Sequence, residues 1–369
     1  RLEAKMAQLE RLTAEPQKRR MGQASAAKDE NLRRARLIFN PKSGEESGKN
    51  SKELVDMVSR LRAHGILAGI GLKTSGKAAR DLAKEAVENN EELVIVAGGD
   101  GTVEDVASQL IGSKTTLGIL PTGTMNNLAR CLGVPLDIED ACALLGVGVT
   151  RQIDVGRVVS NAKPEVEYFL EAAGVGLSAI VIPTGQALEK GRWGVLPLAL
   201  RKLFDTKPEP IQIELDDEPA IHASSQIVTV SNAPMLGKNI LIAPDAKMDD
   251  GYLDIAIYNE MTKTDLLQYF MAASNGQHAE NPKIKFHRAR RVRISANREL
   301  DANSDKELIP GKQVLEIEVV PQALSVVAGK GIGLSLPVEA VPATPPLSGP
   351  QPEGSSNGNG TEKQVETIQ

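Results

Sequence analysis

The alternation of short apolar runs with helical patterns in the first half of the chain constrains its fold more than any other feature. Strands are expected at 36–40, 66–74, 93–97 and 116–120, with helices at 51–64, 78–89 and 103–111 between them. Strands that alternate with helices at this spacing build parallel βαβ units, because each crossover helix returns the chain to the same end of the sheet. The sequence therefore predicts an open α/β sheet.

The pattern changes in the second half of the chain. Strands are expected at 167–173, 211–215, 226–231, 252–257, 291–295 and 314–320, with few helices between them. This pattern is typical of a mainly antiparallel β domain. We expect four parts: a charged helical extension and linker at 1–33, an α/β domain at 34–155, a β-rich domain at 156–336 and a disordered tail at 337–369. The tail prediction rests on its Pro, Gly, Ser and Asn content.

Composition and charge exclude several classes of protein. Aromatic residues make up 3% of the 369 residues and the net charge is −5, which argues against nucleic acid as the main partner. Cys131 and Cys142 lack the spacing of a metal site or a disulfide framework, so reduced thiols in the cytoplasm are expected. No apolar run reaches the roughly 18 residues of a membrane span. The chain begins at Arg1, which leaves an upstream segment or anchor open.

Unusual residues gather where three of the predicted strands end. Asn-Pro-Lys-Ser-Gly at 40–44, Gly-Gly-Asp-Gly-Thr at 98–102 and Pro-Thr-Gly-Thr-Met-Asn-Asn at 121–127 follow the first, third and fourth strands. Ligands of open α/β sheets bind at these strand ends, and glycines let backbone amides approach phosphate oxygens. For any single loop, a plain turn is an equally good interpretation. Three such loops at one end of the sheet favour a nucleotide site.

Asp100 is the informative residue in the second loop. A carboxylate beside a phosphate is repelled unless a metal ion or a substrate hydroxyl stands between them. Asp100 is therefore predicted to serve the metal or the chemistry. The Gly-Lys-Ser/Thr ending of a P-loop is absent, and no Gly-x-Gly-x-x-Gly follows the first strand, which argues against a P-loop nucleotidase and against hydride transfer.

The ordered series of 40–44, Thr74, 98–102 and Gly-Thr-Met-Asn-Asn-Leu-Ala-Arg at 123–130 resembles the diacylglycerol kinase catalytic-domain family. That family includes bacterial lipid kinases and sphingosine and ceramide kinases, and the resemblance spans about 35–328. It implies a Rossmann-like α/β domain, similar to those of NAD kinase and phosphofructokinase, that binds ATP with Mg²⁺. It also implies that a lipid hydroxyl, from diacylglycerol or a sphingoid base, is phosphorylated at the interdomain cleft by a cytoplasmic, peripherally membrane-associated enzyme.

The resemblance also assigns site residues. The nucleotide contacts it implies are Asn40, Pro41, Ser43, Gly44, Thr74, Gly98, Gly99, Asp100, Gly101, Thr102, Gly123, Thr124 and Asn126. Asp100, Asp154 and Asp301 are the implied catalytic acids. In bacterial members a structural magnesium lies at the turn that corresponds to 243–254. Its implied ligands are the Lys247 carbonyl, the Asp250 carboxylate and the Tyr252 carbonyl, and the alternative is a plain Asp-Gly hairpin turn.

One departure from the family pattern affects the general base. Bacterial members carry Asp-Gly-Glu where this chain has Asp301, Ala302 and Asn303, and a neutral amide cannot accept a proton. The base is then Asp301, Asp305 after a shift in alignment, or Asp100.

Several alternatives stay open at this level. A nucleotide-binding regulatory module without catalysis and an NAD kinase are the rival functions. The basic run at 283–293 is either a solvated strand edge or a surface for anionic headgroups. The lipid and the oligomeric state, a homodimer included, are not determined.

Overall fold

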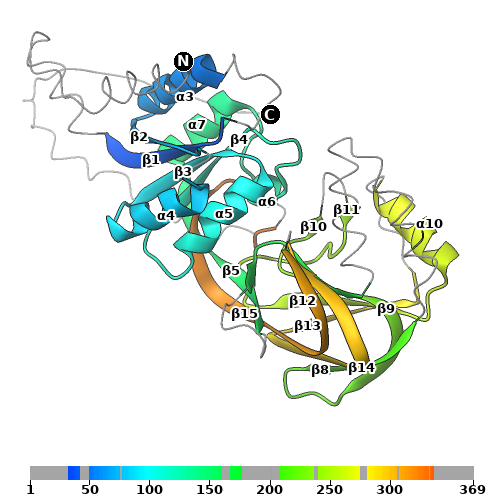
Figure 1. Cartoon of the computed structure of the whole chain (residues 1–369). Coiled ribbons are helices and arrows are strands. Elements are labelled where there is room, and N and C mark those ends of the chain that lie inside the picture. The colour runs from blue at the N-terminus through cyan, green and yellow to red at the C-terminus, as the bar shows by residue number, and fades with distance from the viewer. Residues whose placement is uncertain are drawn as a thin grey trace, which may run out of the picture. The chain divides into compact units, whose positions relative to one another are not determined.

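The computed structural model describes residues 32–41, 50–74, 77–159, 167–176, 201, 208–236, 240–274, 281–305, 307–331 and 333–335, which form a mixed α/β structure (Figure 1). The first half contains β1 (Arg33–Phe39), α3 (Asn50–Ala63), β2 (Ile66–Leu72), α4 (Ala79–Glu88), β3 (Leu93–Gly98), α5 (Asp100–Leu110), β4 (Thr116–Pro121), α6 (Asn127–Cys131) and α7 (Ile138–Val147). The second half contains β5 (Val149–Val159), β6 (Glu167–Phe169), β7 (Ala172–Gly176), β8 (Glu209–Leu215), β9 (Ile221–Ser231), β10 (Met235–Leu236), β11 (Ile240–Leu241), β12 (Leu253–Asn259), α10 (Lys263–Ser274), β13 (Ile284–Ala289), β14 (Arg291–Ser304) and β15 (Glu307–Ala328).

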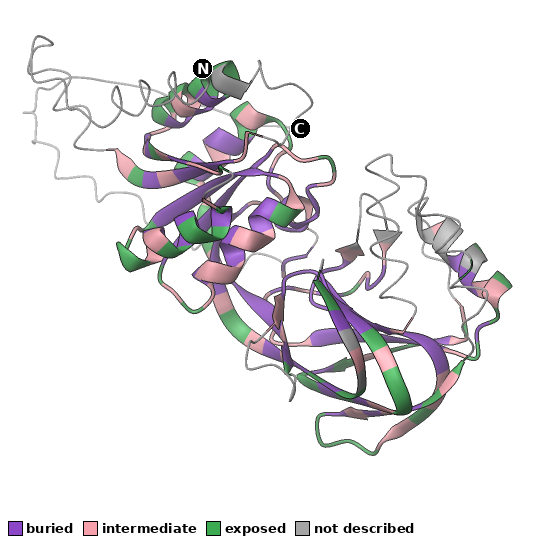
Figure 2. Cartoon of the chain, viewed as in Figure 1, coloured by how far each residue is buried: buried purple, intermediate pink, exposed green. Residues whose placement is uncertain are grey.

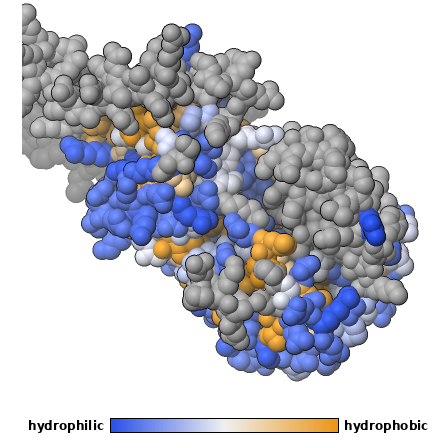
Figure 3. All heavy atoms as spheres, viewed as in Figure 1, coloured by the Kyte–Doolittle hydropathy of each residue, from blue (hydrophilic) through white to orange (hydrophobic). Residues whose placement is uncertain are grey.

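The first half is a parallel sheet in the order β4-β3-β1-β2, as the alternating pattern predicts. Every residue of β3 and of β4 is buried. Strands that are apolar along their whole length need cover on both faces, and helices supply it (Figure 2). In α4 the buried residues follow helical spacing, at Ala79, Leu82, Ala83 and Ala86. Hydrophilic residues form most of the described surface over α4 and α5 (Figure 3).

The second half pairs its strands antiparallel, in the order β13-β12-β9-β7-β14-β15, with β8 beside β9 and β14. Its core is a cluster of aliphatic side chains that includes Val228, Val230, Ile255 and Ile257. Burial alternates with period two along β8, whereas β9 and β12 are buried over most of their length because both of their faces are covered.

Strands β5 and β15 connect the two halves. β15 pairs with β14 near its start and with β4 through Val326 and Leu117, while β5 runs antiparallel to β15. The boundary expected at 155 therefore falls inside a strand, because a long strand pair carries the chain from one half into the other. The predictions for residues 1–31 and for the tail at 337–369 lie outside the described residues.

Candidate active site

The loops after β3 and β4 touch each other backbone to backbone. β3 and β4 are parallel neighbours, so both loops leave the same edge of the sheet. A Cβ atom placed on Gly123 would lie 2.3 Å from the Cα atom of Gly99, and one placed on Gly99 would lie 3.1 Å from the Cα atom of Gly123. Glycine is needed here because the neighbouring atom in each case is backbone, which cannot turn aside.

Asp100, in the loop after β3, connects that loop to the loop after β4. It begins α5, and its carboxylate accepts hydrogen bonds from the backbone amides of Asn126 (3.0 Å) and Asn127 (2.7 Å). Burial raises the pKa of Asp100, and the same two amides oppose that rise. Asp100 is therefore a partly buried carboxylate held by fixed dipoles, with lone pairs left for a further donor.

Asn126 closes the loop after β4. Its backbone is left-handed, with φ 53°, and its side chain pairs with Gly123 in both directions. The side-chain oxygen accepts from the Gly123 amide at 3.0 Å, and the side-chain nitrogen donates to the Gly123 carbonyl at 2.8 Å. An Asn tolerates the left-handed region better than most residues, and the pair fixes the loop that Asp100 grips.

Other residues predicted for the nucleotide lie at the same edge. Asn40 follows β1, and its side-chain nitrogen donates to the Thr102 hydroxyl at 3.0 Å. Thr74 follows β2 and is exposed, as are Gly101 and Thr124. Pro41 follows Asn40 directly. Ser43 and Gly44 lie outside the described residues.

Two buried acids lie next to this loop: Glu171, which the sequence does not assign to the site, and Asp305, which is one of the alternatives for the general base. The Glu171 carboxylate accepts a hydrogen bond from the side-chain nitrogen of Asn127 at 3.0 Å, and Glu171 is 4% exposed. The Asp305 carboxylate accepts from the backbone amides of Leu170, Glu171 and Ala172 at 2.7, 3.1 and 3.0 Å. For Glu171, the sequence does offer a signal: it is the single charged residue inside the apolar run at 168–175.

Known proteins match both halves of the chain. Residues 34–158 match the model of the diacylglycerol kinase catalytic domain, and residues 174–328 match that of the YegS C-terminal NAD kinase beta sandwich-like domain. A diacylglycerol kinase of Bacillus subtilis (strain 168) is 30% identical over 292 residues, which cover 77% of this chain and 93% of the relative. The chain belongs to the diacylglycerol kinase family.

Further relatives agree with that assignment. A diacylglycerol kinase of Staphylococcus saprophyticus is 30% identical over 299 residues, covering 77% of this chain and 95% of the relative. A crystal structure of a diacylglycerol kinase from Bacillus anthracis str. Sterne shares the fold, with a TM-score of 0.63 at 24% identity, over 81% of this chain and 98% of that one. The mixed α/β architecture is therefore that of the family.

The acids considered for the general base in this diacylglycerol kinase family member differ in burial, and Asp301 is the exposed one. It is exposed on β14, whereas Asn303 and Asp305 are buried. Asp305 lies in the turn between β14 and β15, where its carboxylate holds the backbone around Glu171. Asp305 therefore binds the backbone of Glu171 and Asp100 binds the backbone of Asn127, the two residues joined by the Glu171–Asn127 hydrogen bond.

Asp154 is a structural clamp in this fold. It is 1% exposed on β5, and its carboxylate accepts hydrogen bonds from the backbone amides of Gly251 (2.6 Å) and Gln322 (2.8 Å). Burial, followed by the nearby carboxylates of Asp250 and Asp249, raises its pKa above the usual range. Both oxygens of Asp154 accept hydrogen bonds from backbone amides, which gives this residue a structural role alongside the catalytic role that the resemblance implies.

We expect Asp154→Ala to lower the free energy of unfolding by about 2–4 kcal/mol, because two buried amides lose their acceptor. Asp154→Asn keeps one acceptor oxygen and is expected to lose about half as much. Urea unfolding followed by circular dichroism measures both. An Asp154→Ala protein within about 0.5 kcal/mol of wild type would contradict the clamp.

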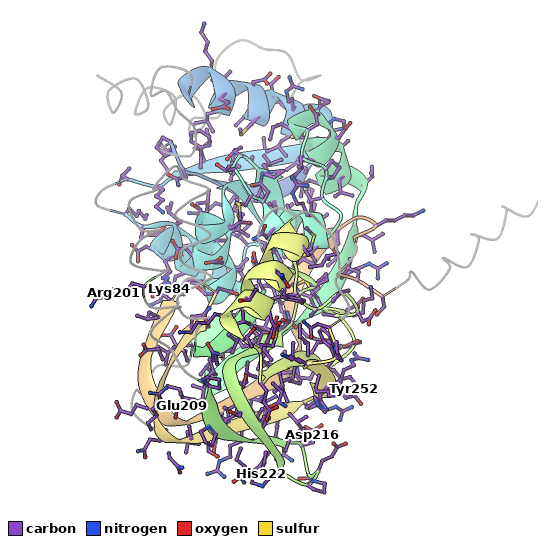
Figure 4. All side chains as sticks on the ribbon, turned by 90° about the vertical axis from the view of Figure 1, so that its right-hand side faces the viewer. Lys84, Arg201, Glu209, Asp216, His222 and Tyr252 are labelled. Carbon is purple, nitrogen blue, oxygen red and sulfur yellow. The ribbon has the colours of Figure 1, made fainter. Side chains whose placement is uncertain are left out.

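The turn implied to bind magnesium is held by an arginine. The Asp250 carboxylate accepts from the Tyr252 amide at 3.1 Å with one oxygen and pairs with the Arg288 guanidinium through the other. The Arg288 guanidinium also lies 5.0 Å from the centre of the Tyr252 ring, which Figure 4 labels, and Arg288 Nε lies 3.6 Å from an Asp254 oxygen. The Asp250 carboxylate has the Arg288 guanidinium as its partner in this arrangement, so a divalent ion held by Lys247, Asp250 and Tyr252 would have to displace that guanidinium.

Arg288→Ala is expected to open this turn to a cation. Without the guanidinium, Asp250 and Asp254 repel each other, and 10 mM Mg²⁺ is expected to raise the melting temperature of the variant by about 3 °C or more through preferential binding to the folded state. Wild type and the control Arg290→Ala, whose guanidinium lies over the same ring, are expected to shift by less than about 1 °C. Equal shifts in all three proteins, measured by scanning fluorimetry, would refute this account.

The basic run at 283–293 is largely neutralised. Ion pairs join Lys283 to Asp265 at 2.6 Å, Arg291 to Asp217 at 3.0 Å and Arg293 to Glu214 at 3.4 Å, in addition to the Arg288 pair. These pairs favour a solvated strand edge over a surface for anionic headgroups. None of the helices within the described part of the chain has the length and apolar character of a membrane span.

Proposed function

We propose that this protein is a lipid kinase that transfers the γ-phosphate of MgATP to the hydroxyl of diacylglycerol or a related lipid alcohol. The observation that carries the proposal is the position of the Asp100 carboxylate. Asp100 begins α5, directly after the glycine loop that follows β3, and its carboxylate is held by two amides of the glycine loop that follows β4. The family supports kinase chemistry and ATP use. The lipid hydroxyl as acceptor rests on the names of the relatives.

The nucleotide is proposed to bind at the carboxyl edge of the parallel sheet. α5 begins at Asp100, so its amino end offers a positive dipole to phosphate. Gly99 and Gly123 expose backbone that phosphate oxygens can approach, and Asn40 and Thr102 add polar side chains. The magnesium ion enters with ATP as part of the substrate and neutralises charge on the phosphates.

Asp100 is proposed to accept the proton of the lipid hydroxyl. The hydroxyl oxygen forms a bond to the γ-phosphorus, the bond from that phosphorus to the β–γ bridging oxygen breaks, and ADP leaves with its electron pair. Phosphoryl transfer needs alignment and charge neutralisation more than covalent help from the protein. The two amides that fix Asp100 supply the alignment, and they leave it lone pairs for the incoming proton.

Incubation of the protein with γ-labelled ATP, Mg²⁺ and vesicles of mixed lipids tests the proposal. We expect label in a lipid phosphate ester, identified by mass. Since the acceptor resides in a bilayer, we also expect the protein to sediment with those vesicles, as a cytoplasmic enzyme acting at a membrane surface would. Binding of an ATP analogue without transfer would indicate the regulatory module, and label in NAD would indicate an NAD kinase.

A further inference from the structure

The turn at 170–172 between β6 and β7 has its backbone held from two sides. The Asp305 carboxylate accepts hydrogen bonds from the backbone amides of all three residues at 170–172. The Glu171 carbonyl accepts from the amides of Asn232 and Ala233 at 2.9 and 3.0 Å, and the side-chain nitrogen of Asn232 donates to the Leu170 carbonyl at 2.9 Å. The backbone that carries the Glu171 side chain is therefore fixed within the antiparallel half.

The partner of that side chain belongs to the parallel half. Asn127 begins α6 and is 4% exposed. Its side-chain nitrogen donates to the Glu171 carboxylate at 3.0 Å, and its backbone amide donates to the Asp100 carboxylate at 2.7 Å. One residue thus contacts Glu171 with its side chain and Asp100 with its backbone. Position 127 thus contacts both halves, through a buried hydrogen bond to Glu171 and a partly buried one to Asp100, and such bonds are costly to break.

We propose that Glu171 is a positioning residue of the phosphoryl transfer: it holds Asn127, and through Asn127 it fixes the Asp100 carboxylate relative to the antiparallel half. This inference rests on the proposed function, in which Asp100 accepts the hydroxyl proton. A carboxylate displaced by about 1 Å from the attacking hydroxyl loses a large part of its rate advantage. Glu171 is thereby assigned a role through Asn127, without contact to substrate.

The charged groups around Glu171 influence the protonation state in which it holds Asn127. The carboxylates of Asp305, Asp100 and Glu104 are the charged groups that act on it, and the Cys131 thiol lies near enough for Glu171 to raise its pKa. Burial and these like charges raise the pKa of Glu171 well above its usual range. The contact with Asn127 requires only an acceptor oxygen, so a protonated carboxyl or an amide can maintain it.

Four variants separate this role from its alternatives. We expect Glu171→Ala to lower kcat for lipid phosphorylation by about 100-fold while the KM for ATP stays within about threefold, because alignment and not nucleotide binding is lost. Asn127→Ala keeps the backbone amide and is expected to lower kcat to a similar extent. The double variant is expected to lose no more than either single one. Glu171→Gln keeps an acceptor and is expected to retain at least about a third of the rate.

The pH dependence of the phosphorylation rate distinguishes a positioning role of Glu171 from a purely structural one, which would leave that dependence unchanged. Ionisation of Glu171, as pH rises through its raised pKa, adds a negative charge near Asp100 and the phosphates, so the wild-type rate is expected to fall as pH increases. The Glu171→Gln rate is expected to lack that fall, since an amide does not ionise. Glu88→Ala and Glu88→Gln, on the exposed end of α4, are the matched controls and are expected to follow wild type.

Each result has a single interpretation. A Glu171→Ala enzyme within about threefold of the wild-type kcat, or a Glu171→Gln enzyme as slow as Glu171→Ala, would overturn the inference. If Glu171→Ala does not fold, Asn127→Ala and Glu171→Gln decide by the same criteria. Absence of lipid phosphorylation by wild type would instead overturn the proposed function, which separates the two failures.

Discussion

Asp100→Asn is expected to lower kcat for lipid phosphorylation by about 1000-fold or more, because the amide cannot accept the hydroxyl proton. Asparagine has the size of aspartate and keeps one acceptor for the amides of 126 and 127, so the loop is expected to stay folded. Asp100→Ala removes both acceptors and is expected to abolish turnover as well.

Steady-state kinetics and binding of an ATP analogue measure this effect. Asp217→Asn is the control, since the Asp217 side chain is 95% exposed and pairs with another surface group, Arg291. It is expected to match wild type within about twofold. Near-normal lipid phosphorylation by Asp100→Ala with an intact fold would show that the proton goes elsewhere, and Asp305 would then be the next acid to replace.

Gly123→Ala is the second change with a large expected effect. The added methyl group would lie 2.3 Å from the Cα atom of Gly99 and 2.8 Å from the side-chain oxygen of Asn126. The two loops must separate, or the Asn126 pair with Gly123 must break. We expect a stability loss of about 1–3 kcal/mol and a rise of at least about tenfold in the KM for ATP, because overpacking displaces the loops proposed to bind phosphate.

Gly69→Ala on β2 is the control for this prediction. The atom nearest to a Cβ at Gly69 is the Ala35 carbonyl oxygen at 3.9 Å, an ordinary contact. Its KM for ATP is expected to stay within about twofold of wild type. Equal behaviour of the two variants, in ATP titrations and in urea unfolding, would show that the contact between the glycine loops does not matter for the nucleotide.

Much of the site could be predicted because it depends on local chemistry. Glycines and an acid directly after buried strands mark the loops at 98–102 and 121–127, and parallel pairing of β3 with β4 guarantees that they share one edge. The order of these motifs along the chain was also sufficient to indicate the family, which the relatives confirm.

The contacts of the acids in the second half could not be predicted from local sequence patterns. Asp301 and Asp305 are four residues apart in sequence, yet one is exposed and the other binds three amides of a distant turn. The resemblance implies Asp154 as a catalytic acid, and only the tertiary structure shows that its two oxygens accept from the backbone amides of 251 and 322. The resemblance implies Asp250 as a metal ligand, and the strand register that sets Arg288 of β13 opposite Asp254 of β12 brings the guanidinium to Asp250.

The sequence by itself determined the layered α/β half, the antiparallel half and the glycine loops with Asp100, since these follow from periodicity and from residues next to one another in the chain. The tertiary structure alone decided which acids meet. Glu171 lies 44 residues from Asn127, and Asp305 lies 134 residues from Glu171. Hydrogen bonds over such separations depend on how strands from both halves pair, and no local pattern encodes that pairing.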